Sequence, residues 1–113
     1  MITKESFTEL ALSFPGTEQM PHFERTGFKL MGKPMFATHL EKDNSANIFL
    51  TPEEQAVFCQ LDRENIYPVP NKWGEKGATT FVLNGVAKEL VREALLSAYN
   101  EVSKSKKAGA KNR

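Results

Sequence analysis

The amino-acid sequence predicts an α+β domain of two layers, in which helices cover one face of a mainly antiparallel five-stranded sheet. Apolar residues recur at helical spacing near both ends of the chain, and an alternation of period two replaces this spacing between residues 20 and 50. Strands and helices do not alternate one by one, as they do in parallel sheets. The expected order of elements is therefore α-β3-α-β2-α.

The first helix is expected to begin after Thr3, because a threonine side chain can accept a hydrogen bond from a free amide of the first turn. Four apolar side chains then recur every three or four residues and predict one buried stripe: Phe7, Leu10, Ala11 and Phe14. Pro15 and Gly16 should end the helix, since proline cannot continue the hydrogen-bond ladder.

Three strands are expected next, with turns at residues 32–34 and 41–45. In the middle strand, the alternation assigns three residues to the face that the helices cover: Phe36, Thr38 and Leu40. The other three are assigned to the uncovered face: Met35, Ala37 and His39. His39 is accordingly predicted to be exposed to solvent.

A second helix is predicted from Thr51-Pro52-Glu53-Glu54, which has the residue types of a reciprocal cap followed by proline in the first turn. Two strands should follow, one near residues 66–69 and one over residues 79–83. The wide apolar face of a last helix ends at Val102. We treat residues 1–103 as one domain and residues 104–113 as a basic, disordered tail.

Composition and charge limit the classes of protein that fit. Cys59 is the single cysteine, so the chain has no internal disulfide, and no stretch approaches the ~18 apolar residues of a membrane span. We therefore expect a cytoplasmic monomer that does not bind membranes. The net charge of +1 includes five basic residues among the last eleven, which leaves −4 for the rest. Nucleic-acid binding would thus need local basic patches or the tail.

A set of short motifs, in a fixed order along the chain, carries a resemblance to a known family. The motifs are Phe14-Pro15-Gly16, Pro21-His22-Phe23, Gly27-Phe28-Lys29-Leu30, Gly32-Lys33-Pro34-Met35-Phe36-Ala37, Leu50-Thr51-Pro52-Glu53-Glu54, Tyr67-Pro68-Val69-Pro70-Asn71-Lys72-Trp73-Gly74 and Thr79-Thr80-Phe81-Val82-Leu83. Together they resemble the MmcQ/YjbR family over roughly residues 3–103. The resemblance implies a CyaY-like, secretion-chaperone-like domain with a double-wing arrangement for DNA binding. Many relatives have a tryptophan where this chain has Ala78.

Residues 67–77 are the most unusual stretch of the chain, with two of its six prolines, two of its seven glycines and its single tryptophan. They predict a rigid, exposed loop. In that loop Lys72 and Lys76 are candidates for phosphate contacts, and Trp73 is a candidate for stacking on a base. The indole could instead close the edge of the core, and this packing interpretation is the one we favour.

Arg25, Lys29 and Lys33 border the first predicted hairpin and form a second basic projection. Two basic projections could lie like wings along a DNA duplex. Ordinary solvated surface charge is the default interpretation of all five basic residues, because a chain with 26% charged residues must expose most of them.

The remaining reactive side chains have plainer explanations. Cys59 is expected to behave as a small, buried or half-buried hydrophobe, and His22 to pack edge-on or make a structural hydrogen bond. His22, His39 and Cys59 lack the spacing of metal ligands, so we predict no metal site, no cofactor and no catalytic residue.

The function predicted from the sequence is that of a non-enzymatic intracellular binding domain that contacts double-stranded DNA through the two basic projections. A protein- or peptide-binding module that uses the uncovered sheet face is the main alternative. A small-ligand binder or an enzyme that uses His22 is the third.

Overall fold

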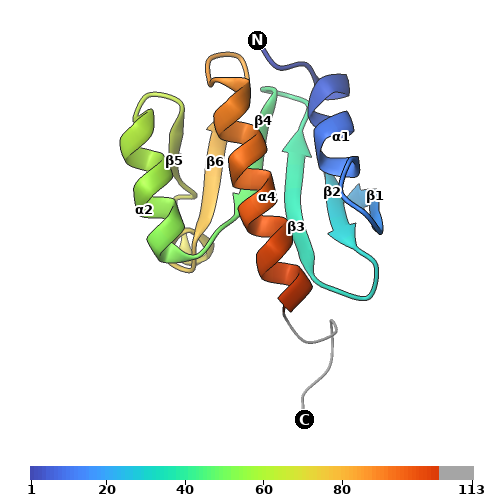
Figure 1. Cartoon of the computed structure of the whole chain (residues 1–113). Helices are drawn as coiled ribbons and strands as arrows, with labels where there is room; N and C mark the ends of the chain where they lie inside the picture. The colour runs from blue at the N-terminus through green and yellow to red at the C-terminus, as the bar shows by residue number, and fades with distance from the viewer. Residues whose placement is uncertain (105–113) are drawn as a thin grey trace.

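An antiparallel sheet with helices packed on one face makes up the computed structural model, which describes residues 1–104 (Figure 1). The predicted α+β class is confirmed. The prediction of a disordered tail falls on residues 105–113, which lie outside the described residues, whereas Lys104 is the last residue of the C-terminal helix.

The sheet has six strands, not the five predicted, in the spatial order β1-β2-β3-β4-β6-β5. Their bounds are β1 (Thr17–His22), β2 (Arg25–Leu30), β3 (Met35–Leu40), β4 (Ser45–Phe49), β5 (Ile66–Pro68) and β6 (Ala78–Val82). The additional strand is β1, whose sequence is polar and contains Pro21. As an edge strand, β1 pairs with a neighbour on one side only and needs neither an apolar alternation nor every amide donor.

Four helices complete the fold: α1 (Lys4–Leu12), α2 (Pro52–Leu61), α3 (Lys72–Glu75) and α4 (Lys88–Lys104). Both predicted N-caps are confirmed, since Thr3 accepts a hydrogen bond from the Ser6 amide and Thr51 forms a reciprocal capping box with Glu54. The short helix α3 was not predicted. It lies within the stretch expected to be a loop.

The core lies between the sheet and helices α1, α2 and α4. The Phe7 ring meets the edge of Phe28 at 5.6 Å between centroids, and Phe58 on α2 meets Phe81 on β6 at 6.2 Å. Burying one such side chain contributes about 1.5–3 kcal/mol. The hydroxyl of Tyr99 on α4 also donates a hydrogen bond to the Pro15 carbonyl, at 2.7 Å. This bond holds the end of α1 against α4.

A β-bulge in β3 reverses the predicted faces of that strand. Phe28 pairs with Ala37 but Lys29 pairs with Met35, so Phe36 is the additional residue. Phe36 packs on the helical side, against Tyr99, and every second residue after the bulge from Ala37 onward also faces the helices.

The faces assigned to four residues of β3 are therefore wrong: Ala37 and His39 face the helices, and Thr38 and Leu40 face away from them. His39 was predicted to be exposed but is only 2% exposed, with its ring 5.7 Å from that of Phe7.

Candidate nucleic-acid interface

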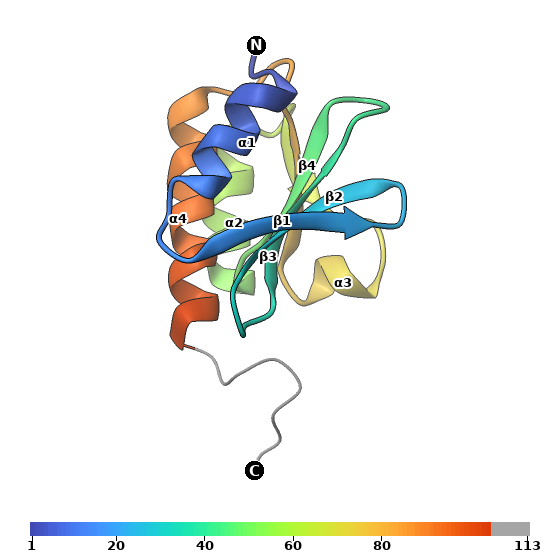
Figure 2. The same cartoon turned by 90° about the vertical axis from the view of Figure 1, so that its right-hand side faces the viewer.

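The sheet surface that α1, α2 and α4 leave uncovered is called here the open face. Figure 2 shows these three helices on one side of the sheet, and α3 at one end of the open face on the other side. Hydrogen bonds between side chains cross the middle of this face. Thr80 Oγ1 donates to Asn47 Oδ1 at 2.8 Å, and Arg25 Nη1 donates to Thr38 Oγ1 at 3.1 Å.

Helix α3 is built by the capping residue before it and a glycine inside it. The Asn71 side chain caps α3 by accepting a hydrogen bond from the Trp73 amide, at 2.8 Å. Gly74 packs so closely on the preceding chain that an added Cβ would lie 1.8 Å from the Val69 carbonyl oxygen. No other residue fits at this position unless the backbone moves.

A side chain from the helical layer fixes α3 in place. Gln55 on α2 donates two hydrogen bonds through Nε2, to the Gly74 carbonyl at 2.9 Å and to the Ala78 carbonyl at 3.0 Å. Gly77 has φ +116° and approaches Leu50 too closely to carry a side chain. These contacts fix the conformation of the stretch in this structure, and its rigidity stays a prediction.

Trp73 lies on the surface of α3 and is 66% exposed, so the favoured prediction that its indole closes the core is wrong. The Lys76 ammonium nitrogen lies 5.5 Å from the centre of the indole ring, within the range of a cation–π contact. Lys72, one residue before Trp73, is also exposed. One short helix therefore presents an accessible aromatic ring between two lysines.

The other predicted contact residues come from β2 and the turn after it. Lys29 lies on the open face, because its neighbour Phe28 points into the core. Lys33 lies in the β2–β3 turn and is half-buried. Arg25 begins β2, four residues from Lys29 and thus about 13 Å away along the strand. Its guanidinium lies partly buried against Thr38.

Strand pairing brings most of these residues to one end of the sheet. Lys29 pairs with Met35 in β3, while Phe49 in β4 pairs with Ala78, which follows α3 closely in the chain. Strand β6 lies two strands from β3 and three from β2, so α3 and the β2–β3 turn are about 10 to 15 Å apart across the sheet. Arg25 belongs to the opposite end.

Charge is unevenly distributed between the two sides of the domain. Residues 17–50 and 66–83, which form the sheet, its turns and α3, carry six basic and five acidic residues, a net charge of +1. Residues 1–16, 51–65 and 84–104, which form the helical layer and its connections, carry five basic and nine acidic residues, a net charge of −4. An anionic ligand is therefore favoured at the open face and disfavoured at the helices.

The tip of the β1–β2 hairpin holds an exposed aromatic residue that the sequence analysis assigned no role. Phe23 is 91% exposed and has φ +58°, and its ring contacts that of His22 edge-on at 4.9 Å between centroids. The edge-on packing predicted for His22 is confirmed. The sequence did contain a sign that Phe23 is unusual. The two-residue loop Phe23-Glu24 lacks the glycine, asparagine or aspartate that tight hairpins favour.

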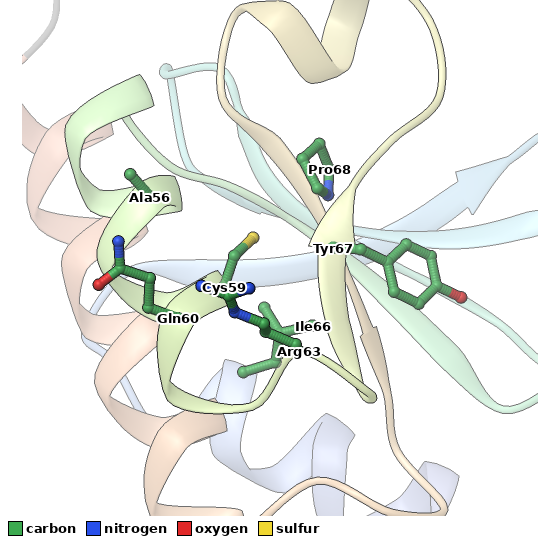
Figure 3. Close-up of a pocket in the computed structure, with 7 residues that line it drawn as sticks. All are labelled: Ala56, Cys59, Gln60, Arg63, Ile66, Tyr67 and Pro68. Carbon is green, nitrogen blue, oxygen red and sulfur yellow. The ribbon is translucent and has the colours of Figure 1, made fainter.

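A shallow groove between α2 and β5 holds the single cysteine (Figure 3). Its lining residues are Ala56, Cys59, Gln60, Arg63, Ile66, Tyr67 and Pro68. Cys59 is half-buried, as predicted, and burial raises the pKa of its thiol. A raised pKa leaves the thiol protonated and weakly nucleophilic at neutral pH, which is the opposite of what a catalytic cysteine requires.

Within residues 1–104, no three side chains of His, Cys, Asp or Glu gather closely enough to hold a metal ion. The two histidines face opposite sides of the sheet, since His22 pairs with Arg25 at the hairpin tip and His39 packs on Phe7 under α1. Over the same described residues, no helix has the length and apolar character needed to cross a membrane.

Comparisons with known proteins give the chain a family and a structural relative. The family model described as YjbR matches residues 12–101. The crystal structure of the Deinococcus radiodurans protein DR2400, with the family-model domain DUF419, is similar to this chain with a TM-score of 0.78. The two are 24% identical in sequence, over 99% of this chain and 84% of that one, and at this identity the likeness shows a shared fold. A search of curated proteins found no match.

Proposed function

This chain belongs to the MmcQ/YjbR family, and from that premise we propose that it is a cytoplasmic, non-enzymatic domain that binds double-stranded DNA along its open face. We also group its fold with the CyaY-like, secretion-chaperone-like domains. The observation that carries the proposal is the exposed Trp73 between Lys72 and Lys76, on the side of the molecule with net charge +1 rather than −4.

Each candidate residue has a distinct role in the proposed complex. Lys72 and Lys76 contact phosphates of one strand, and the Trp73 indole packs on the sugars or an exposed base beside them. Lys33, in the turn before β3, contacts the backbone about 10 Å away, and Lys29, on β2 and three strands from β6, contacts it about 15 Å away. Arg25, held by Thr38, supplies a fixed positive charge at the far end of the face.

The helical layer supports the same orientation. Its net charge of −4 repels phosphates, so a duplex that approaches the domain turns toward the open face. Contacts that go chiefly to the backbone predict binding with little dependence on base sequence and strong dependence on salt.

Fluorescence of the single tryptophan provides a direct test, because Trp73 lies within the proposed interface. The full chain is titrated with a duplex at several salt concentrations, alongside the double variant Lys72→Ala/Lys76→Ala. Each lost phosphate contact lowers the slope of log affinity against log salt by about 0.9, so the double variant should lose about 2 in slope and bind more weakly at every salt concentration.

A matched control separates local contact from general charge. Lys88→Ala/Arg92→Ala removes the same two charges from exposed positions of α4, on the other side of the domain. A third variant replaces Lys106, Lys107, Lys111 and Arg113 of the tail with glutamine. The proposal fails if either control weakens binding as much as the α3 variant does, or if Trp73 emission does not respond to DNA.

Peptide binding is the second candidate, because half-buried apolar side chains also lie on the open face. Met35 lies across Gly27, where an added Cβ would be 2.5 Å from its sulfur, and Leu40 and Phe49 lie further along the sheet. Flexible methionines suit apolar partners of varied shape. Such binding would change little with salt and would weaken in Met35→Ala, whereas DNA binding would show the reverse.

A further inference from the structure

Phe23 occupies a backbone conformation that phenylalanine rarely adopts. His22 pairs with Arg25, so Phe23 and Glu24 alone form the hairpin loop, and Phe23 has φ +58°. Tight loops of this kind usually place glycine, asparagine or aspartate at positive φ, because the Cβ of a larger residue crowds the backbone. Phenylalanine therefore costs stability at this position.

No packing interaction in the described structure compensates for this loss of stability. The Phe23 side chain is 91% exposed, and the one ring contact that it makes in the described structure is with its neighbour His22. Strained residues kept where packing does not require them are concentrated at functional sites. Phe23, at the tip of the hairpin, is such a residue, and its ring is accessible to a binding partner.

We propose that Phe23 is a wedge that enters the base stack of bound DNA at a flexible or mispaired step. This inference rests on the proposed function, and it adds a preference for deformable DNA. Apolar side chains inserted between base steps unstack them and kink the duplex. Pyrimidine–purine steps and mismatches open most readily, whereas A-tracts are stiff.

The position of the hairpin fits this role. In Figure 2 the β1–β2 hairpin and α3 both project from the sheet on the side away from the three long helices. The strand register puts the tip near one end of the sheet and α3 near the other, three strands apart. The separation is about 20 Å. A duplex held at Lys72 and Lys76 therefore reaches Phe23 about six base-pair steps away, at 3.4 Å a step.

Glu24 disfavours a phosphate contact at the two-residue loop itself. Its carboxylate lies beside Phe23 in the loop and repels the DNA backbone, so the ring is the attractive group. If the tip enters the duplex, Glu24→Gln tightens binding severalfold and Glu93→Gln, an equal change on exposed α4, does not.

The experiment compares the full-length protein with Phe23→Gly and Phe23→Leu on two duplexes. One carries the fluorescent base 2-aminopurine beside a mismatched TA-rich step, and the other is a fully paired A-tract. Wild type should raise the 2-aminopurine emission and bind the first duplex about tenfold more tightly than the second. Phe23→Gly should lose both the emission change and the preference, and Phe23→Leu should keep them, since leucine also serves as a wedge.

Folding and location are controlled in the same series. Glycine adopts positive φ without strain, so Phe23→Gly should melt at least as high as wild type, and a loss of preference cannot be ascribed to unfolding. Val57→Ala, at a 58% exposed apolar residue of α2, should change neither readout. Equal binding of both duplexes by wild type, with Trp73 still responding, would overturn the wedge alone. No binding to either duplex would overturn the proposed function as well.

Discussion

The thiol of Cys59 lies half-buried in the groove between α2 and β5. Burial favours the neutral thiol over the thiolate, which raises its pKa. Because the thiolate is the form that reacts with alkylating agents, the native protein should react more slowly than the unfolded chain at any pH below the raised pKa.

Alkylation by iodoacetamide tests this expectation at the residue scale. The rate is measured from pH 7 to pH 10 in buffer and in denaturing urea, with mass spectrometry to count modified chains. The pH–rate curve of the folded protein should be displaced toward higher pH. A native rate equal to or above the unfolded rate at pH 7.5 would show that Cys59 is activated, and that the groove is a reactive site.

Two residues show how local surroundings decide exposure. Trp73 follows Asn71, whose side chain caps α3 through the Trp73 amide, and the indole is left 66% exposed. His39 follows the bulge at Phe36 and is buried against Phe7. For His39, the bulge overrides the alternation of apolar and polar residues from which its exposure was predicted. For Trp73, the cap and the short helix override the packing preference of an indole, from which its burial was predicted.

At the scale of elements, the position of α3 depends on Gly74, and replacing this glycine with alanine should lower the stability of the domain. In Gly74→Ala the new Cβ would meet the Val69 backbone at 1.8 Å, so α3 must shift from its place beside β6. We expect a loss of about 1–3 kcal/mol in the free energy of unfolding, measured by urea titration, together with a changed Trp73 emission spectrum.

Gly85→Ala is the matched control for that substitution. Its added Cβ would first meet the side-chain amide of Asn65, at 2.5 Å, and a side chain can rotate away where a backbone cannot. The expected loss is smaller, below about 1 kcal/mol. Similar losses in the two variants would mean that α3 is free to move, and the rigid presentation of Trp73 would be wrong.

The long elements were predicted well because they depend on local signals. The cap at Thr3, the capping box at Thr51 and the apolar faces of α1 and α4 are visible in consecutive residues, and the structure confirms them. Strand β1 was missed because its extended conformation is stabilised by pairing with β2 and is not indicated by its own composition. The stability of an edge strand depends more on pairing with its neighbour than on an alternation of apolar and polar residues.

At the scale of the whole molecule, one asparagine joins three distant parts of the chain. Asn44, at φ +51° in the β3–β4 turn, contacts His39 Nε2 through Oδ1 at 2.9 Å. Its Nδ2 donates to the Ile2 carbonyl and to Asn84 Oδ1, each at 2.9 Å. The N-terminus, the middle of the sheet and the turn before α4 are thereby connected.

Asn44→Gly removes these bonds while keeping a residue that tolerates positive φ. It leaves Nε2 of buried His39 without its partner, which should lower the free energy of unfolding by about 1–3 kcal/mol in a urea titration. Asn84→Ala, which loses one exposed bond of the same group, should cost about 0.5 kcal/mol. Equal costs would show that the connection to His39 contributes nothing to stability.

The separation of charge is also a property of the whole molecule. Basic and acidic residues are interleaved along the sequence, and the sequence yields only a net −4 for the chain without its tail. Folding places the excess of acids on the helical layer and leaves the sheet, its turns and α3 with a net charge of +1. That local balance, rather than the total, is what an approaching polyanion meets.

The sequence by itself determined the α+β class, the long helices with their caps and the family. Each of these follows from residue types a few positions apart in the sequence, and those separations do not depend on the tertiary structure. Only the tertiary structure decided that Trp73 and Phe23 are exposed, that His39 is buried and that Lys29 lies at the same end of the sheet as α3. These depend on strand pairing and on one bulge, which bring together residues far apart in the chain and have no signature in any single segment.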